Sequence, residues 1–504
     1  MKHSLHVLLC LLGFFTVGTV VYSQTPISAG ITVGVVEVYP GPGENAYKSD
    51  LYRVEVSDGT RWLETYTYKI ARKSNTSFKG AGGADPSVNF AIFGTTAILT
   101  VRVSKLLGSI TSAEISPKSK NIVSTISNGS AIFELRPYDK AWVVVDGDNG
   151  DPLFVFANPL KPAVPPGAVY FGPGVHDIGL AFGSKSGQAI YLDGGAWVIG
   201  TIDLRGRHDV RILGPGVLSG EKWSAEIFSH KPDNMIYRMI IGDKSSASTG
   251  NRLEDIAIVN SPSYNIYGGP EYIGNVKLLS PWWSSTDGFQ VLPRGANRLA
   301  LIERCFAFVG DDIFFPRENY LGNIEIRNCF VSSTNNSVFQ ISYWGNTLDH
   351  QNRAYVHDID IKNYLPKHNS AVFRASICKA TDTGVKNMTF ENIRIEGALK
   401  CPLVQIENRE YFWPEQTTHP ETKLGNTWNM VFRNISAEIP ADKLKTIKST
   451  LLGLDSENSH HDYLFENVRI NGVVLDQTNY PDYFRVNNFT SGIHFSAQPF
   501  LKDK

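Results

Sequence analysis

The sequence predicts an all-β protein in two parts, an N-terminal antiparallel β-sandwich followed by a right-handed parallel β-helix. Two observations support this. Short alternating apolar segments divided by turn residues fill the first third of the chain, and a repeated string of Asn or Asp with apolar residues fills most of the remainder. A proline-rich stretch at 159–166 separates the two patterns. With 504 residues, the chain has room for two domains.

Residues 1–23 are typical of a secretory signal peptide. A Lys-His start precedes an apolar stretch from Leu5 to Val21, and Val21-Tyr22-Ser23 offers a cleavage point before Gln24. The apolar stretch is short and broken by Gly and Thr, which argues against a membrane anchor. We therefore expect a protein that is secreted or periplasmic.

Residues 24–160 form the first expected domain. Its apolar segments are separated by turn sequences such as PGPGEN, SDGT, SNGS and DGDNGD. At least seven strands at this spacing are typical of an antiparallel β-sandwich. Acids, histidines and nucleophiles do not gather in it, so we expect a supporting role, with carbohydrate binding as the alternative.

A stiff linker is expected at 161–168, a β-helix at 169–487 and a tail at 488–504. In the β-helix region, the Asn or Asp strings recur every 20 to 46 residues. A single turn of a solenoid cannot bury its own apolar strand, but stacked turns share one core. Asn and Asp bond locally in turns, so we interpret Asn275, Asn323 and Asn387 as turn-ladder residues.

Composition argues against several kinds of partner. Lys and Arg (48) nearly balance Asp and Glu (49), and no long basic run occurs, so we expect neither nucleic acid nor membrane as a partner. No cysteine pattern has zinc spacing, and we expect no metal, no cofactor and a monomer. Cys305 and Cys329 lie 24 residues apart in similar strings. They are expected to stack as small core residues, and a disulfide between them stays open.

The candidate site lies between residues 282 and 317. Asp287 stands in a Thr-Asp-Gly, and Asp311 and Asp312 stand in a Gly-Asp-Asp 24 residues later. In a solenoid this spacing is one turn, so Asp287 would lie beside Asp311 at roughly 4.8 Å. Carboxylates this close raise each other's pKa, which a fold tolerates only where a site needs it. The alternative is that both motifs are ordinary turn dipeptides. We expect Gly310 to bend the strand, so that Asp311 and Asp312 reach one surface.

The stretch WWSSTDG (282–288), followed by GDD (310–312), resembles the catalytic region of family 49 glycoside hydrolases, the dextranases and isopullulanases. Family 28 polygalacturonases are more distantly similar. They also carry a Gly-His-Gly and an Arg-Ile-Lys that this chain lacks, which weakens the prediction of a uronic-acid substrate. The resemblance implies an inverting hydrolase of an α-glucan such as dextran, cleaving α-1,6 linkages. Asp311, flanked by two carboxylates, is expected to hold its proton more firmly than a free aspartate, which suits it as general acid. The resemblance then implies that Asp287 and Asp312 activate water together.

Residues around the acidic motifs are candidates to bind the sugar. Aromatic rings offer flat apolar faces, and amides and guanidinium groups bind hydroxyls. For each of them a structural or solvated role is the alternative. The substrate-binding candidates are Trp282, Trp283, Arg317, Gln340, Tyr343, Trp344, His350, Lys379 and Trp413.

Other functions stay open. A β-helix polysaccharide lyase would use the three aspartates to bind calcium, and a polygalacturonase-like hydrolase would act on a uronic-acid polymer. A non-catalytic surface protein would bind glycans without turnover. Chelator sensitivity, ultraviolet-absorbing products and a reducing-sugar assay distinguish these functions.

Overall fold

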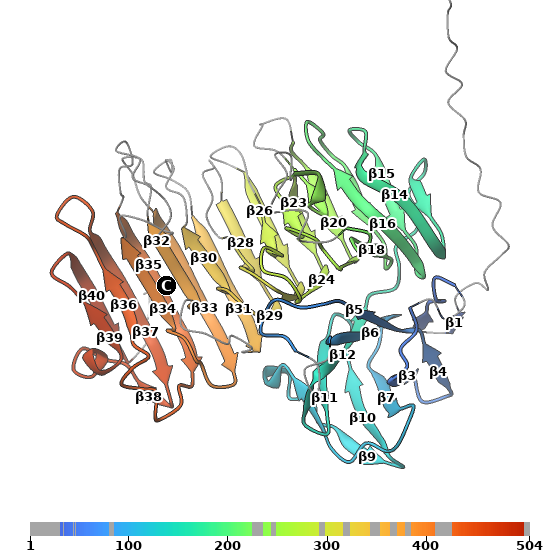
Figure 1. Cartoon of the computed structure of the whole chain (residues 1–504), viewed down its shortest axis with the longest axis horizontal. Helices are drawn as coiled ribbons and strands as arrows, with labels where there is room; N and C mark the ends of the chain where they lie inside the picture. The colour runs from blue at the N-terminus through green and yellow to red at the C-terminus, as the bar shows by residue number, and fades with distance from the viewer. Residues whose placement is uncertain are drawn as a thin grey trace, which may run out of the picture.

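The computed structural model describes residues 31–33, 35–43, 45, 47–79, 85–223, 235–242, 248–291, 298–315, 323–342, 353–362, 370–377, 385–408 and 426–497. Nearly all regular structure in these ranges is β-strand (Figure 1). The helices there are three-residue 3-10 turns, η2 (Lys118–Lys120), η4 (Met235–Tyr237) and η5 (Tyr480–Asp482), and none could span a membrane. The predicted all-β class is confirmed.

The N-terminal domain is a sandwich of two mainly antiparallel sheets. One sheet has the order β1 (Ile31–Val33), β2 (Val36–Val38), β6 (Ser87–Thr95), β12 (Asp148–Asn158), β11 (Lys140–Val145) and β8 (Ala113–Ser116), with β5 (Thr67–Ala71) also beside β6. The other has the order β4 (Trp62–Thr65), β3 (Tyr52–Ser57), β7 (Leu99–Lys105), β10 (Ser130–Leu135) and β9 (Thr125–Ser127). Strands of both sheets contribute to one apolar core, because alternate residues point inward.

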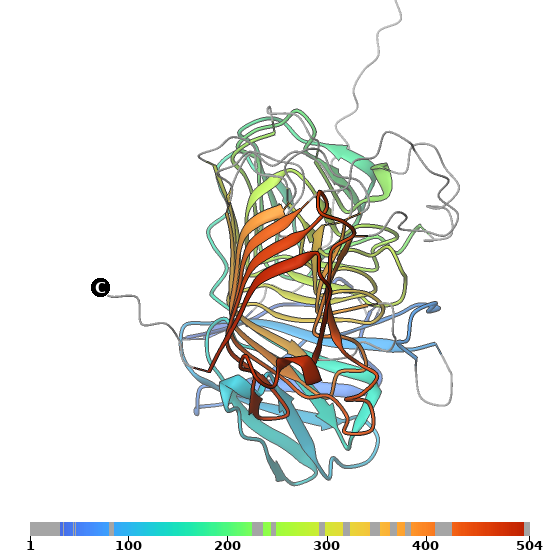
Figure 2. The same ribbon diagram turned by 90° about the vertical axis from the view of Figure 1, so that its left-hand side faces the viewer.

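The rest of the chain is a parallel β-helix whose strands stack in three columns (Figures 1 and 2). The first column holds β13 (Val169–Phe171), β15 (Ala189–Leu192), β17 (Arg211–Leu213), β20 (Asn251–Glu254), β23 (Pro270–Gly274), β26 (Leu299–Glu303), β28 (Asn323–Arg327), β31 (Ala354–Lys362), β33 (Val385–Glu396), β35 (Thr427–Ala437), β37 (His460–Ile470) and β40 (Thr490–Ser496). The second holds β14 (Gly174–Gly183), β16 (Ala196–Asp203), β18 (Val217–Ser219), β21 (Ala257–Val259), β24 (Lys277–Ser280), β27 (Phe306–Val309) and β29 (Phe330–Ser333), and continues in the second halves of the long strands from β31 onward.

The third column holds β19 (Ile240–Ile241), β22 (Ile266–Tyr267), β25 (Phe289–Gln290), β30 (Phe339–Ser342), β32 (Phe373–Ile377), β34 (Val404–Asn408), β36 (Ser449–Leu452) and β39 (Phe484–Val486). Phe314 bridges β25 and β30 as a single residue. A short strand, β38 (Val473–Val474), turns back antiparallel on β37. The expected tail is corrected in part, because β40 pairs in parallel with β37 and extends the β-helix to Ser496.

Stacked side chains hold the coils in register. Along one edge, Asn392 Nδ2 donates to Asp358 Oδ1 (3.2 Å), Asn434 Nδ2 to Asn392 Oδ1 (3.1 Å) and Asn467 Nδ2 to Asn434 Oδ1 (2.9 Å). All four residues have positive φ, which Asn and Asp tolerate at bends. Asn275 and Asn387 also make such rung-to-rung bonds, but Asn323 instead accepts from the Arg353 amide.

A column of phenylalanines fills the interior at the third face. The rings of Phe289, Phe314, Phe339 and Phe373 stack with successive centroid distances of 5.3, 5.6 and 5.0 Å. These distances are close to the spacing between neighbouring strands of a sheet. One ring per coil therefore fixes how adjacent coils align where the third column begins.

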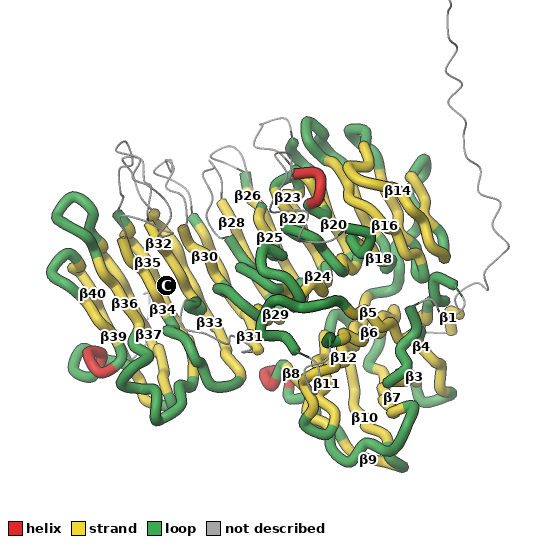
Figure 3. Tube along the Cα trace, in the orientation of Figure 1, coloured by secondary structure: helices red, strands yellow, loops and turns green. Residues whose placement is uncertain are grey.

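The sandwich packs on the second column of the β-helix (Figure 3). Trp142, Phe154 and Phe156 from the sandwich contact Phe306 and Phe308 from β27, with ring centroids 4.9 to 5.6 Å apart. Strands β6 and β11 are buried at every position, because one face packs on the sandwich core and the other on the β-helix. The two domains therefore share a continuous apolar interface.

Candidate active site

Asp287 and Asp312 occupy equivalent positions in successive coils, at the turn between the second and third columns. Phe289 pairs with Phe314, which sets residue 287 opposite residue 312. The Gly288 amide donates to the Asp312 carbonyl at 2.8 Å. The repeat is thus 25 residues here, so Asp287 lies opposite Asp312. The expectation that Asp287 lies beside Asp311 was wrong by one residue.

Gly310 allows this arrangement through close packing. Its φ is not in the left-handed region, contrary to the expected reason for a glycine here. A Cβ atom at Gly310 would lie 2.1 Å from the Trp283 carbonyl oxygen. The Gly310 amide donates to Thr286 Oγ1 at 2.9 Å. The glycine therefore lets the Gly-Asp-Asp segment approach the turn before Asp287.

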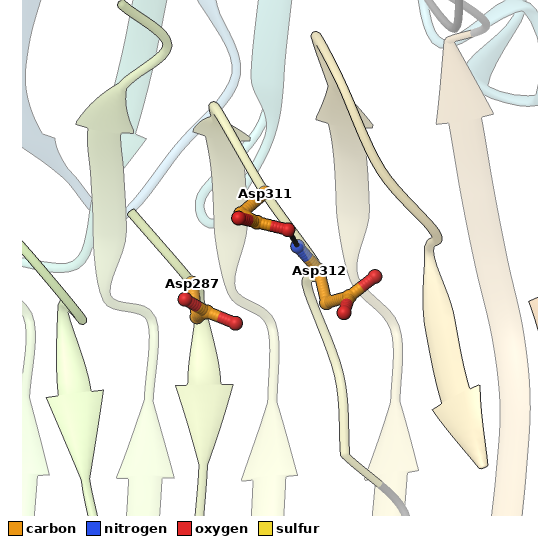
Figure 4. A group of neighbouring side chains, drawn as sticks. All are labelled: Asp287, Asp311 and Asp312. Atoms are coloured by element: carbon orange, nitrogen blue, oxygen red, sulfur yellow. Dashed lines mark hydrogen bonds between the residues drawn. The ribbon is translucent and has the colours of Figure 1, made fainter. Parts of the chain in front are cut away.

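The three carboxylates converge (Figure 4). One oxygen from each of Asp287, Asp311 and Asp312 lies within 4.8 Å of the others. Asp287 and Asp312 are buried and Asp311 is partly exposed. The sequence prediction that these three side chains meet agrees with this geometry, and Asp311 is the carboxyl with the most access to solvent.

Hydrogen bonds distinguish Asp311 from its neighbours. Asp311 Oδ2 accepts from the Ser285 amide (2.5 Å), and Oδ1 accepts from the Asp312 amide (2.9 Å) and from Asn336 Nδ2 (2.8 Å). Arg374 Nη1 in turn donates to Asn336 Oδ1 at 3.0 Å. Burial raises the pKa of Asp311, and these donors oppose the rise.

Fewer donors reach the other two carboxylates. Asp312 Oδ1 accepts from the Ser337 amide at 2.8 Å, and the carboxylate of Asp287 is bonded by its own backbone amide. Burial, followed by the charge of Asp311, raises the pKa of Asp287 and of Asp312 well above the usual range. Each of these groups therefore holds a proton more firmly than a solvated aspartate, and when ionised is a stronger base.

Two arginines that the sequence analysis did not single out oppose the rise in the pKa values of the three aspartates. Arg374 favours the ionised forms of Asp311 and Asp312, and Arg238 favours that of Asp287. Arg238 lies in the same row as Asp287, two coils earlier, over the ring of Tyr267 at 3.5 Å. Only the strand pairing identifies Arg238 as a neighbour of the site, because the residue paired with Asp287 in the preceding coil is Tyr264, and the residue paired with Tyr264 is Arg238.

A loop of the sandwich reaches the turn that carries Asp287. The Asn75 amide donates to the Trp282 carbonyl (2.9 Å), and the Ser284 amide donates to Asn75 Oδ1 (3.1 Å). The next amide, of Ser285, is the one that binds Asp311, and Ser285 has a φ of 82°. A non-glycine residue in this region is strained by about 1–2 kcal/mol. The sandwich loop therefore helps to hold a strained turn in place.

The substrate-binding candidates have different outcomes. Trp282 is a correction: it is 2% exposed, contacts Phe78 of the sandwich and donates from Nε1 to the Pro86 carbonyl (3.2 Å), so it cannot line a groove. Trp283 is half-buried beside the trio's turn, and Gln340 is buried on β30. Six candidates lie outside the described residues, namely Arg317, Tyr343, Trp344, His350, Lys379 and Trp413.

The cysteines stack as expected. Cys305 and Cys329 are buried in successive coils, both are free thiols, and the Cys305 amide lies 3.4 Å from Cys329 Sγ as a donor. Cys401 is also free and buried. The open question of a Cys305–Cys329 disulfide is thus answered in favour of two thiols.

Similarity to known proteins agrees with this geometry. No protein-family profile matches the chain. It is 28% identical over 246 residues to a probable exopolygalacturonase B of Emericella nidulans, covering 46% of this chain and 54% of that protein. It is 26% identical over 270 residues to a dextranase of Arthrobacter globiformis, covering 47% of this chain and 41% of the dextranase. The chain thus matches only about half the length of these relatives.

The fold has a close counterpart among solved structures. Dex49A from Penicillium minioluteum superimposes with a TM-score of 0.64 at 13% identity, over 93% of this chain and all of that one. At this identity the likeness concerns fold alone. Together with the dextranase and exopolygalacturonase relatives and the WWSSTDG and GDD motifs, it confirms the resemblance to family 49 glycoside hydrolases and a relationship to polygalacturonases.

Proposed function

We propose that this protein is a glycoside hydrolase that cleaves an α-glucan such as dextran, using Asp287, Asp311 and Asp312. The convergence of three carboxylates within 4.8 Å carries the proposal. Glycoside hydrolysis needs one carboxyl to protonate the leaving oxygen and another group to activate water or attack the sugar. Burial raises the pKa of all three, which helps one to keep its proton and makes the others stronger bases.

Asp311 is the proposed general acid. It is the most exposed of the three and so the best placed to meet a glycosidic oxygen. Its Oδ1 already accepts two hydrogen bonds and its Oδ2 only one, so we expect the transferable proton on Oδ2. As the bond between the anomeric carbon and the glycosidic oxygen breaks, this proton passes to the leaving oxygen.

Asp287 and Asp312 are the proposed base. Together they take a proton from a water molecule, whose oxygen attacks the anomeric carbon from the face opposite to the leaving group. After release of the products, a proton returns from the base pair to Asp311 through solvent. Hydrolysis then leaves the enzyme in its starting state.

Stereochemistry is the sharpest test of this mechanism. We propose inversion, as the resemblance implies. The short distance between the carboxylates favours the other outcome, because inverting enzymes usually separate acid and base by roughly 6.5–9.5 Å and retaining ones by about 5 Å. A proton NMR time course on dextran should show the inverted anomer first. If the retained anomer comes first, one of the trio is a nucleophile and the proposal is wrong.

The substrate is tested with a panel of dextran, pullulan, polygalacturonate and α-1,3-glucan, followed by reducing-sugar release. Dextran is expected to be cleaved fastest. Polygalacturonate is the second candidate, because the exopolygalacturonase relative is as similar as the dextranases. Unsaturated products that absorb in the ultraviolet, or loss of activity with a chelator, would identify a lyase instead. Binding without turnover across the panel would identify a glycan-binding protein.

Export is part of the proposal. A polymer of this kind lies outside the cell that degrades it, and residues 1–23 have the pattern of a signal peptide, although they lie outside the described residues. Amino-terminal sequencing of protein recovered from the culture medium or periplasm should begin near Gln24.

A further inference from the structure

A cavity of about 550 Å³ lies between the sandwich and the β-helix, away from the aspartate trio. Its walls come from η2 and the start of β11 on one side, and from residues that flank or belong to β27, β29, β31 and β33 on the other. The cavity is lined by Phe330 at the start of β29, whereas Asn336, which bonds Asp311, follows the end of that strand. None of the described residues that bond the trio lines this cavity.

Two cations on the walls have hydrogen-bond donors without acceptors. Lys140 is 6% exposed, and among the described residues its ammonium donates only to the Tyr138 carbonyl, at 2.8 Å. Arg304 lies over the Tyr138 ring at 4.8 Å, and its Nη2 is ion-paired with Glu303, but its buried Nε has no acceptor in the described part of the chain. Both cations thus meet at one residue. Burial lowers the pKa of Lys140 to about 8, so the group is still mainly charged at neutral pH.

The acids on the walls already have donors. Asp360 accepts from Arg394 Nε (2.6 Å) and Ser119 Oγ (2.8 Å), and Asp358 accepts from Asn392 Nδ2 (3.2 Å). Asp139 also lies on the walls, where it accepts from the Arg136 amide (2.8 Å) and faces Lys120 at 3.6 Å, and its charge favours the ionised form of Lys140. Among the described residues, none of these acids accepts a hydrogen bond from Lys140. A carboxylate offers about four acceptor positions, however, so these acids can still accept from hydroxyl groups.

This combination selects a type of ligand. The ammonium of Lys140 and the Nε–H of Arg304 call for an acceptor, because an unpaired buried donor is costly, and a carboxylate is a strong acceptor. Carboxylates that retain acceptor capacity call for hydroxyl groups. Tyr138 is 39% exposed and offers an aromatic ring, and the volume is within the range of small-molecule sites. Tyr138 also has a φ of 70°, and strained backbone of this kind gathers at functional sites.

We propose that this cavity is a second binding site that takes a small sugar acid, with its carboxylate between Lys140 and Arg304 and its hydroxyls facing the acids of the β-helix. The sandwich then binds ligand jointly with the β-helix, at a place where no bond is cleaved. The proposal does not depend on the hydrolase activity.

Isothermal titration calorimetry on the full chain tests this, with the Asp311→Asn variant as host so that no turnover interferes. The probes are sodium D-galacturonate, D-galactose and sodium sulfate. Galacturonate should bind with measurable heat, and galactose and sulfate at least about tenfold more weakly, because each lacks one part of the recognised chemistry. Lys140→Gln and Arg304→Gln should each weaken galacturonate by about 10-fold or more.

Lys118→Gln is the matched control. Lys118 lies in the same short helix as the cavity residue Lys120, but its ammonium pairs with Glu114 at the surface (3.1 Å) and does not line the cavity. The Lys118→Gln variant should bind galacturonate as tightly as the host protein. If Lys140→Gln fails to fold by circular dichroism, the more exposed Arg304→Gln still decides the question. No heat with galacturonate, equal binding of galactose or sulfate, or full binding in Arg304→Gln would each overturn the proposal.

Discussion

Two edges of the same β-helix stack polar side chains in opposite ways. At Asp358, Asn392, Asn434 and Asn467, each amide donates to the oxygen one coil below, so every rung satisfies the next. At Asp287 and Asp312, the same one-residue-per-coil stacking brings together carboxylates, which can only accept when ionised. The amide ladder stabilises the coil repeat, and the carboxylate stack destabilises it at neutral pH. Both edges stack one side chain per coil. Whether that side chain is an amide or a carboxylate decides whether the edge stabilises the fold or forms a reactive site.

Removing Asp311, the proposed general acid beside the carboxylate stack, should have the largest effect. Asp311→Asn is expected to lower hydrolysis of polysaccharide by about 10²–10⁴-fold, because the leaving oxygen loses its proton donor. Activated aryl glycosides, if the site admits them, should be partly spared because their leaving groups need little protonation. Initial rates on both substrate types measure this. Near-full activity of the variant on polysaccharide would show that another residue is the acid.

Asp287→Asn should abolish most activity and also stabilise the fold. The pKa of Asp287 is raised in the folded chain above the unfolded value near 3.9, so folding stability falls as pH rises from about 4 through the folded pKa. Asn avoids this cost, which is about 1.4 kcal/mol for each unit by which the pKa is raised. The increase in Tm should therefore be present at pH 7 and absent near pH 4. An equal change at both pH values would point to packing and not to charge.

A carboxylate can be placed within the amide ladder. Asn434→Asp should cost about 1–3 kcal/mol at pH 7, because the new carboxylate still accepts from Asn467 but faces Asn392 Oδ1 without a proton to donate. The loss should shrink at pH 4, where the carboxyl is largely protonated. Asn434→Gly, which keeps the positive φ, is the control for simple loss of the bonds. Urea denaturation at both pH values gives the comparison.

Substitution of Asn75 in the sandwich loop should have the smallest effect on activity, because it acts on Asp311 only through the turn before Asp287. Asn75→Ala should lower kcat several-fold and move the alkaline limb of its pH profile to higher pH, because Ser284 loses its fixed partner, the Ser285 amide holds Asp311 less well and the pKa of this general acid rises. Lys73→Ala, an exposed neighbour in the same loop, should leave both unchanged. A fall in kcat with an unaltered pH profile would mean that Asn75 only supports the fold.

Sequence reasoning succeeded where the local pattern carries the information. The alternating segments and the Asn or Asp strings predicted both architectures, since each reflects the period of its own fold. The meeting of Asp287, Asp311 and Asp312 also followed from spacing. The partner of Asp287 did not, because one inserted residue per coil decides whether residue 311 or 312 lies opposite, and only the pairing of Phe289 with Phe314 reveals it.

Contacts between distant segments escaped prediction for a similar reason. Trp282 reads as a sugar-binding aromatic beside a catalytic motif, but it faces a loop about 200 residues earlier in the chain. Arg238 and Arg374 act on the trio from other coils, and nothing in their own surroundings in the sequence marks them. These contacts depend on tertiary packing, and no local pattern in the sequence indicates them.

The aromatic interface between the domains limits how this protein can be divided. Without the sandwich, Trp282, Phe306, Phe308 and Phe330 would form a contiguous apolar patch on the β-helix surface, and patches of this kind promote aggregation. The turn before Asp287 would also lose its contact with Asn75. The carboxylate-bearing half is therefore not a transferable module: exchange between proteins, or separate expression, has to move both halves as one unit.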